Sequence, residues 1–519
     1  MAILRYTASA DNTITNAFEA NLTDRGTGSN MGYADALEVF SIYGQMSSST
    51  MGQSQELSRI LIDFDVPTLI ADRSAGTLAA SGSVSWYLKM HNARTPFTLP
   101  QGFNLVVAPI SRSWSEGTGL DMDEYQDAGA SNWLSSSTGS PWATVGGDYM
   151  TGSNYTVNFP LGYEDMNLDV SDLVEKWISG ADSAYTVRSG VGIRLVSTEE
   201  AYYSGSSGLT TGAAGPLSTS GSLIHNPNGA RESYYTKKFF SRSSEFFFKR
   251  PVLEARWNSG VFDDRENFYF SSSNAPSEDN LNTLVFYNYI RGQLVNPPAV
   301  GTNDIFVSFY SSSNSAPTGS KLNLAQGGAV VTDLDVNATG GLLSTGIYTC
   351  NVALTAATTP LTVIHDVWHS GGVEYFTGSF YPEKFPTYDS NPTFTKVTSC
   401  RNLKDVYSGA ETSRFRFFVR SKDWSPTVYT VATAVNPTEV MPSASYNVRR
   451  VIDNYDAIPY GTGSDLCTLL SYDKDGNYFD LDMRLLENGY MYEIKLSYYN
   501  DSIGAWQEQP QTFKFRVDE

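Results

Sequence analysis

The chain has 519 residues, enough for about three domains of ordinary size, each able to bury a core without disulfides or metal ions. It carries 35 basic and 55 acidic residues, a net charge of −20, and its basic residues form no run longer than a pair. These features argue against a nucleic-acid partner, because phosphate binding needs clustered Lys and Arg.

Aromatic residues make up 13 % of the chain, and 43 Gly and 22 Pro supply turns, which together favour many short strands over helices. The N-terminal stretch MAILRYTASADNTITNAF does not have the pattern of a signal peptide, and no apolar run is long enough to span a bilayer. Cys350, Cys400 and Cys467 have no metal-like spacing, so we expect buried free thiols and synthesis in a reducing cytoplasm.

Several segments of the first half indicate strands, because apolar residues alternate or run together between turn-forming residues. They cover residues 58–66, 82–90, 103–109, 190–196 and 251–257. Residues 169–178 predict one short helix, with Ser171 as its N-cap, Trp177 on its apolar stripe and Gly180 at its end. The Ser- and Gly-rich stretch 201–221 predicts a long loop or the tip of an inserted hairpin.

After Trp257 the strand pattern restarts and continues to the end of the chain. Strands are expected at residues 284–289, 304–310, 346–354, 361–368, 373–380, 414–420, 490–498 and 512–517. Residues 468–482 predict a hairpin that turns at Asp475-Gly476, and the prolines of 382–392 predict a hinge. The sequence therefore predicts an all-β chain of three consecutive β-sandwich domains (jelly-roll or immunoglobulin-like), 1–257, 258–385 and 386–519, with the one helix in the first domain.

Three segments could hold a metal ion by composition, but each has a plainer interpretation. His365 and His369 would lie about 13 Å apart along an expected strand, too far for one ion. Residues 473–477 partly match a calcium loop, but their strand-like flanks favour a hairpin turn. The four acids of residues 119–127 could bind structural calcium, although a solvated acidic loop is the default. We assign no catalytic, cofactor-binding or metal-binding residue and expect no cofactor.

No motif favours an enzyme. The chain has no G-x-S-x-G in a strand-to-helix setting, no phosphate-binding loop and only four His, although paired carboxylates for sugar hydrolysis could still meet in space. Trp133, Trp142 and Trp506 are candidate platforms for a carbohydrate, but we expect each in a core or an interface first.

An ordered series of segments in the first half resembles the DNRLRE-type β-sandwich family, which is found in secreted and cell-wall proteins and in phage virion proteins. The series consists of residues 11–15, 28–32, 58–66, 113–119, 131–133, 142 with 146–148, 168–177, 191–196, 239–243 and 249–254. The chain departs from the family in its Ser/Gly-rich stretch at 201–221 and in lacking the secretion signal of cellular members.

The C-terminal part resembles virion structural proteins of tailed phages, notably marine ones. The stretches concerned are residues 427–430, 458–462, 470–473, 476–480 and 513–517. Together the two resemblances imply a non-enzymatic structural component of a bacteriophage virion, at the neck, tail or proximal fibre, that forms a homo-oligomer and binds other virion proteins. A capsid-decorating protein and an adhesin for a host-surface glycan are the alternatives, and a polysaccharide-degrading enzyme is a more distant one. No nucleic-acid or membrane partner is expected.

Overall fold

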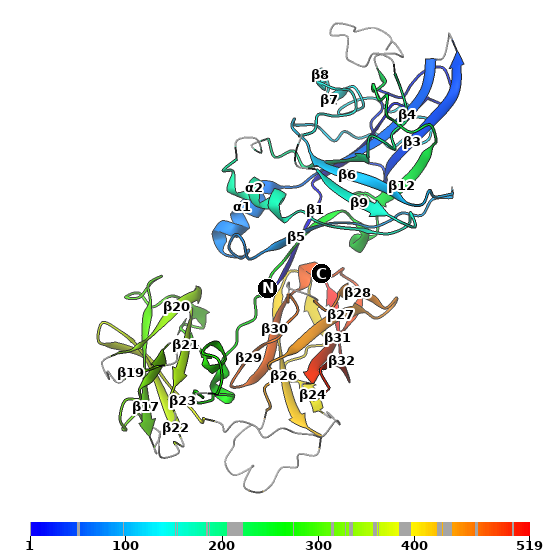
Figure 1. Ribbon diagram of the computed structural model, residues 1–519. Helices are drawn as coiled ribbons and strands as arrows, with labels where there is room; N and C mark the ends of the chain where they lie inside the picture. Colours follow the sequence, from blue (N-terminus) through cyan, green and yellow to red (C-terminus); the bar gives the residue numbers. More distant parts are fainter. Residues whose placement is uncertain are drawn as a thin grey trace. The chain divides into compact units, whose positions relative to one another are not determined.

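The computed structural model describes residues 2–519 except 49–51, 97, 151, 153, 183–184, 186, 205–221, 273, 313–315, 327–328, 332–335, 356–360, 362, 383–395, 423–427, 429–437, 462–465 and 501–502. The described residues hold thirty-two strands and two α-helices, so the predicted all-β class is confirmed (Figure 1). The chain divides into two compact units, Ile3–Trp257 and Asn258–Glu519, and Ala2 belongs to the second of them. The predicted hinge, apart from Pro382, and the expected boundary at 385/386 lie outside the described residues.

Two antiparallel sheets and a small hairpin make up the first unit. The smaller sheet has the order β1-β13-β5-β10, and the larger has the order β12-β3-β4-β11-β6-β9, with β2 also paired to β4. The smaller sheet consists of β1 (Ile3–Thr7), β5 (Ser85–Met90), β10 (Met166–Asp169) and β13 (Val252–Arg256). The larger consists of β2 (Ala10–Thr15), β3 (Ala36–Ser48), β4 (Gly52–Asp63), β6 (Phe103–Pro109), β9 (Tyr155–Phe159), β11 (Val191–Leu195) and β12 (Tyr234–Phe240), while β7 (Ser135–Ser137) pairs with β8 (Ser140–Pro141).

Side-chain alternation explains these strands. On β5 the side chains of Trp86, Leu88 and Met90 are buried, and those between them are only partly covered. This two-residue period is what a sheet with one face on a core requires. All five segments predicted as strands in the first half contain one, although β4 ends at Asp63 instead of residue 66.

The first unit has two helices where the sequence predicted one. Helix α2 (Ser171–Ser179) is confirmed, with Trp177 buried and Gly180 at its C-cap, but its N-cap is Val170. The Ser171 hydroxyl instead accepts a hydrogen bond from Trp86 N at 2.8 Å.

Helix α1 (Val66–Ala75) was not predicted, because its start was taken as the tail of a strand. Pro at the first turn and Gly76 in the left-handed conformation at the C-cap were its sequence signals. Arg73 of α1 forms an ion pair with Glu175 of α2 at 2.6 Å, which ties the two helices together.

The predicted loop at 201–221 is anchored at both ends. Residues 205–221 lie outside the described residues, but Ala201 and Ser222 are buried. Gln55 Nε2 donates to Ala201 O at 2.8 Å, and Trp133 Nε1 donates to Ser222 O at 2.8 Å. The ends of this stretch are therefore part of the first unit's core.

An eight-stranded sheet forms the N-terminal part of the second unit. Its strand order is β19-β18-β21-β20-β17-β22-β23, with β14 also paired to β21. The strands are β14 (Asn282–Tyr287), β17 (Ile305–Ser312), β18 (Leu324–Gln326), β19 (Ala329–Val331), β20 (Ala338–Ser344), β21 (Ile347–Leu354), β22 (Val363–Ser370) and β23 (Val373–Phe380); a separate hairpin joins β15 (Tyr289–Ile290) to β16 (Gln293–Leu294).

Strand β20 turns a corner in this sheet. Its first half pairs with β17 and its second half with β21, and Gly340 and Gly341 lie at the change of partner. A Cβ atom at Gly340 would lie 2.9 Å from the Trp368 ring, so glycine allows the strand to bend close over the core. The sheet consequently curves around Trp368, Phe286 and Tyr348.

Strand β14, which pairs only with β21, and strand β23 at one end of the sheet share no ladder in the described residues. The short 3₁₀ helix η4 (Asp264–Glu266) contacts both of them. It closes the seam that the strands leave open.

Two further sheets form the C-terminal part of the second unit. One has the order β24-β26-β30-β29 and the other β25-β32-β31-β27-β28. Their strands are β24 (Lys396–Cys400), β25 (Val406–Ser408), β26 (Thr412–Ser421), β27 (Ala444–Arg450), β28 (Tyr455–Ile458), β29 (Ser471–Asp473), β30 (Gly476–Asp482), β31 (Met491–Asn500) and β32 (Ala505–Asp518). Aromatic side chains fill the core, where Tyr446 stacks on Phe479 with ring centroids 3.8 Å apart. The predicted hairpin at 468–482 is confirmed by β29 and β30, but its turn residues are Lys474 and Asp475, and Gly476 is already the first residue of β30.

The cysteines differ in burial. None of the three described cysteines forms a disulfide; Cys350 and Cys467 are buried as predicted, but Cys400, at the end of a strand, is only half-buried. Burial raises the pKa of Cys350 to about 12, so its thiol stays protonated at neutral pH. Among the described helices, neither has the length and apolar character needed to cross a membrane.

Candidate functional site

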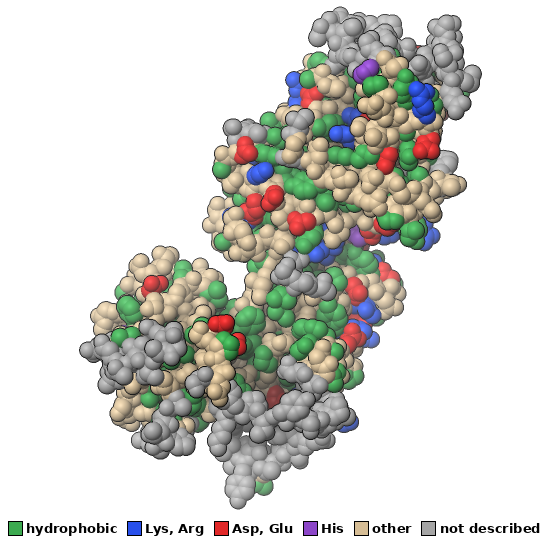
Figure 2. Space-filling view, in the orientation of Figure 1, with side chains coloured by type: hydrophobic (Ala, Val, Ile, Leu, Met, Phe, Trp, Pro, Cys, Tyr) green, Lys and Arg blue, Asp and Glu red, His purple; other side chains and the backbone are tan. Residues whose placement is uncertain are grey.

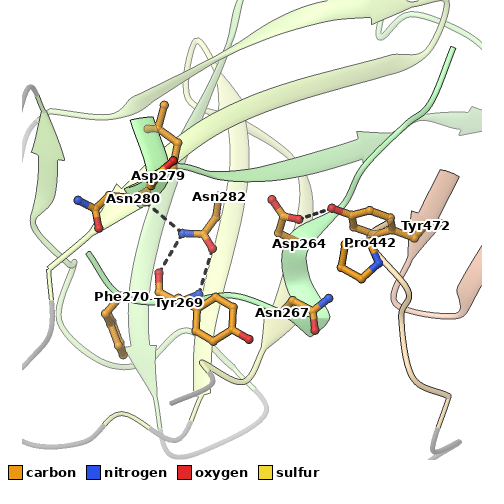
Figure 3. A pocket seen from close by; sticks show the side chains of 10 residues that line it. Asp264, Asn267, Tyr269, Phe270, Asp279, Asn280, Asn282, Pro442 and Tyr472 are labelled. Carbon is orange, nitrogen blue, oxygen red and sulfur yellow. Dashed lines mark hydrogen bonds between the residues drawn. The ribbon is translucent and has the colours of Figure 1, made fainter. Parts of the chain in front are cut away.

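The segment around η4 forms a candidate site because its neighbouring charged residues, Asp264 and Arg265, lie in two different places, one in a pocket and one in a core. Asp264 lines a pocket of about 230 Å³, and Arg265 enters the core of the curved sheet. Figure 3 shows the pocket, whose remaining lining residues are Asn267, Tyr269, Phe270, Asp279, Asn280, Leu281, Asn282, Pro442 and Tyr472. The pocket thus combines residues 264–282 with two residues that lie far away in the sequence.

Most of the polar groups in the pocket hold its walls in place. Asp264 accepts hydrogen bonds from Tyr472 Oη at 2.7 Å and from Thr283 N at 2.6 Å. The Asn282 amide bonds the backbone N–H and C=O of Tyr269 at 3.0 and 2.9 Å (Figure 3). Both oxygens of Asp264 are therefore occupied, which makes it a poor general acid or base.

Two lining side chains are free to bind a ligand. Those of Asn267 and Asp279 form no hydrogen bond with any described residue, and Asp279 is exposed. They face the same pocket as the rings of Tyr269 and Phe270. A carboxylate, a carboxamide and aromatic rings are groups that can hold a small polar molecule.

The core side of η4 is a buried ion cluster. Arg265 donates to Asp366 Oδ2 at 2.5 Å, to the backbone O of Val285 on β14 at 2.7 Å, and to Asp263. Trp368 Nε1 also donates to Asp366, at 2.7 Å. One arginine thus joins η4, β14 and β22 across the seam.

Two carboxylates share the single arginine, so the cluster has an excess negative charge. Burial raises the pKa of Asp263 to about 7 against the attraction of Arg265, and the negative Asp366 adds to the rise. Burial alone would lower the pKa of Arg265, but the two carboxylates raise it, so the guanidinium stays charged.

We expect the second unit to lose stability as the pH rises from about 5 to 7. The folded-state pKa of Asp263 lies above the ordinary aspartate value of 3.8, so the folded state binds more protons than the unfolded state in this interval. The stability gained from this extra proton is lost as the pH passes about 7. The expected slope is roughly 1 kcal/mol per pH unit. Urea unfolding of the intact chain at several pH values should show this slope, and Asp263→Asn should flatten it. A slope that is equal in both proteins would contradict the assignment.

The tryptophans considered as carbohydrate platforms differ in exposure. Trp133 and Trp142 are buried in the core of the first unit, as expected. Trp506 on β32 is 48 % exposed and lies edge-on against Tyr499, with ring centroids 5.6 Å apart. Only Trp506 of the three could meet a ligand from solvent.

The segments considered for metal binding are occupied by protein contacts. On β22, His369 bonds Ser308 at 2.9 Å and His365 bonds the backbone O of Gly378 at 3.1 Å. Asp473 accepts a bidentate pair of bonds from Arg416. Asp121 of the acidic loop accepts backbone N–H groups from its own loop. The part of the chain that the structure describes contains no group of three or more His, Cys, Asp or Glu side chains placed to hold a metal ion.

Sequence reasoning missed the η4 region. Residues 263–266 read Asp-Asp-Arg-Glu, which would ordinarily be a solvated turn. The flanking aromatic residues, Phe262 and Phe268, were the signal that this charged run enters a core.

No protein-family model and no curated protein matches the chain. Solved structures with some similarity include the N-terminal Ig1-2 module of the Drosophila receptor protein tyrosine phosphatase DLAR, at 8 % identity over 46 % of this chain and 91 % of that one, with a TM-score of 0.13. The trypsin-activated alpha-2-macroglobulin of Escherichia coli has 8 % identity and a TM-score of 0.15, and the methylamine-reacted Salmonella alpha-2-macroglobulin has 9 % and 0.14. This chain is covered to 99 % but spans only 30 % and 34 % of those two proteins. Because these TM-scores are low, the fold assignment rests on the sheets described above.

Proposed function

We propose that the chain is a structural component of a bacteriophage particle, at the neck, tail or proximal fibre, and acts through protein–protein interfaces. The ordered DNRLRE-like segments of the first half and the phage-like segments of the C-terminal part are the basis of this proposal. An array of β-sheet units suits it, because such units present strand edges and loops to neighbouring proteins.

The observation that carries the interface role is an apolar hairpin end. Where β31 meets β32, Ile503 is 44 % exposed and Trp506 is 48 % exposed, beside the half-buried Tyr499. Single exposed apolar side chains are ordinary, but a group with an exposed tryptophan is typical of a contact surface. Figure 2 also shows hydrophobic side chains on the visible faces of both units. We define Tyr499, Ile503 and Trp506 as the hairpin patch.

Light scattering of the purified chain should give a mass of at least two monomers, at an integer multiple of the monomer mass. Trp506→Ala should raise the dissociation constant of this oligomer at least tenfold, because large aromatic side chains dominate such contacts. Ile452→Ala is the matched control, since Ile452 is 76 % exposed and lies in the turn between β27 and β28. Antibodies against the chain should also label purified particles. A monomer together with unlabelled particles would overturn the proposal.

The second candidate is an adhesin that binds glycans of the host surface, and the exposed Trp506 supports this candidate. In that case the chain would remain monomeric, and Trp506→Ala would abolish binding to envelope glycans without changing the mass. A capsid-decorating protein would also be an oligomer, and antibodies against it would also label purified particles. In that case the label would lie on the capsid and not on the neck, tail or fibre.

A further inference from the structure

We propose that the pocket beside η4 binds one ring of a neutral sugar, a pyranose, as a site separate from the interfaces of the structural role. The pocket holds about 230 Å³, below the roughly 300–1,000 Å³ of sites for drug-sized ligands. This space suits a single ring better than an extended chain. The ring would enter beside Asp279, which is exposed at the pocket.

Four of the lining residues carry groups that match the chemistry of a pyranose. The Asp279 carboxylate can accept hydrogen bonds from two neighbouring hydroxyls. The Asn267 carboxamide can both donate and accept, which lets it bond a hydroxyl in either sense. Tyr269 and Phe270 supply aromatic surface for the apolar C–H face of the ring. These four residues belong to the segment that follows η4 and leads through η5 (Glu278–Asn280) toward β14.

The walls are fixed before any ligand arrives. Asp264 bonds Tyr472 and Thr283, and Asn282 bonds the backbone of Tyr269 on both of its groups (Figure 3). Asn280 holds the adjoining loop through Ser272 N at 2.7 Å and Ser272 O at 3.0 Å. A preformed wall reduces the ordering cost of binding, so a small ligand can still bind measurably.

Other ligand classes fit less well. An anion would face the carboxylates of Asp264 and Asp279 in one pocket. A metal ion needs several free ligand atoms, but both oxygens of Asp264 are already bonded. A wholly apolar ligand would cover the half-buried Asn267 carboxamide without offering it a hydrogen bond.

Saturation-transfer NMR with the full chain tests this proposal. The probes are the methyl glycosides of glucose, galactose, mannose and N-acetylglucosamine, and we expect at least one to bind with a dissociation constant on the order of 1 mM. Asn267→Ala and Asp279→Ala should each weaken that binding at least fivefold. Asp304→Ala, at another exposed aspartate of the same unit, is the control and should leave binding unchanged.

Two results would overturn the sugar site: no saturation transfer to any of the four glycosides, or transfer that both pocket variants leave unchanged. Circular dichroism of each variant checks that the fold is retained. Because the oligomer is measured separately by light scattering, failure of the sugar site leaves the structural role standing, and the reverse also holds.

Discussion

Replacing Arg265 with Met should destabilise the second unit by about 3–5 kcal/mol. The guanidinium bonds Asp366 and the Val285 carbonyl, and it also pairs with Asp263, so its loss leaves two buried carboxylates without their cation. It also removes the hydrogen bonds by which one side chain of η4 reaches both β14 and β22. Urea unfolding should report the loss, and hydrogen exchange should place it in β14 and β22.

Two further variants serve as controls for this result: a substitution of an exposed arginine, and a combination that restores the lost stability. Arg291 lies exposed in the turn between β15 and β16, so Arg291→Met should change stability by less than about 0.5 kcal/mol. Adding Asp263→Asn and Asp366→Asn to Arg265→Met should recover much of the loss, because the uncompensated charge is then gone. If the single variant were as stable as the parent, the cluster would not hold the seam.

Local patterns were sufficient to predict about half of the described strands. The alternation of Trp86, Leu88 and Met90 predicted β5, and the segment 373–380 matches β23 at both ends. Helix α1 was missed because only Val66 and Leu69 of its ten residues are buried, so its apolar stripe is weak. Its capping residues were informative, but Pro67 and Gly76 also fit a turn between strands.

The pocket and the ion cluster could not be predicted in the same way. Asp264 and Tyr472 are 208 positions apart and meet where Asp263 N donates to Tyr472 O and the Phe262 ring packs on Tyr472. Arg265 and Asp366 are likewise 101 positions apart. Hydrophobic periodicity and composition describe one segment of the sequence at a time. These contacts instead depend on the open seam between β14 and β23 in the curved sheet.

Gly190→Ala should destabilise the first unit by more than about 3 kcal/mol. Gly190 precedes β11 with a φ of +73°, a conformation that costs a residue with a Cβ atom about 1–2 kcal/mol. The new Cβ would also lie 1.9 Å from the Ile62 carbonyl oxygen and 2.6 Å from Asp63 Cα. Both are backbone atoms at the end of β4, so the β4–β11 ladder itself must move. Thermal unfolding and urea unfolding of the intact chain measure this cost.

Gly102 separates the two parts of that cost. It precedes β6, the other neighbour of β11, with a φ of +71°, but a Cβ there would meet nothing within 4 Å. Gly102→Ala should therefore cost only the conformational part, about 1–2 kcal/mol. The difference between the two variants is the energy of the backbone collision at β4. If both variants lost the same stability, the β4 backbone at Asp63 would move at no cost to make room for the Cβ atom. The close approach of β11 to β4 would then not set the register of the larger sheet.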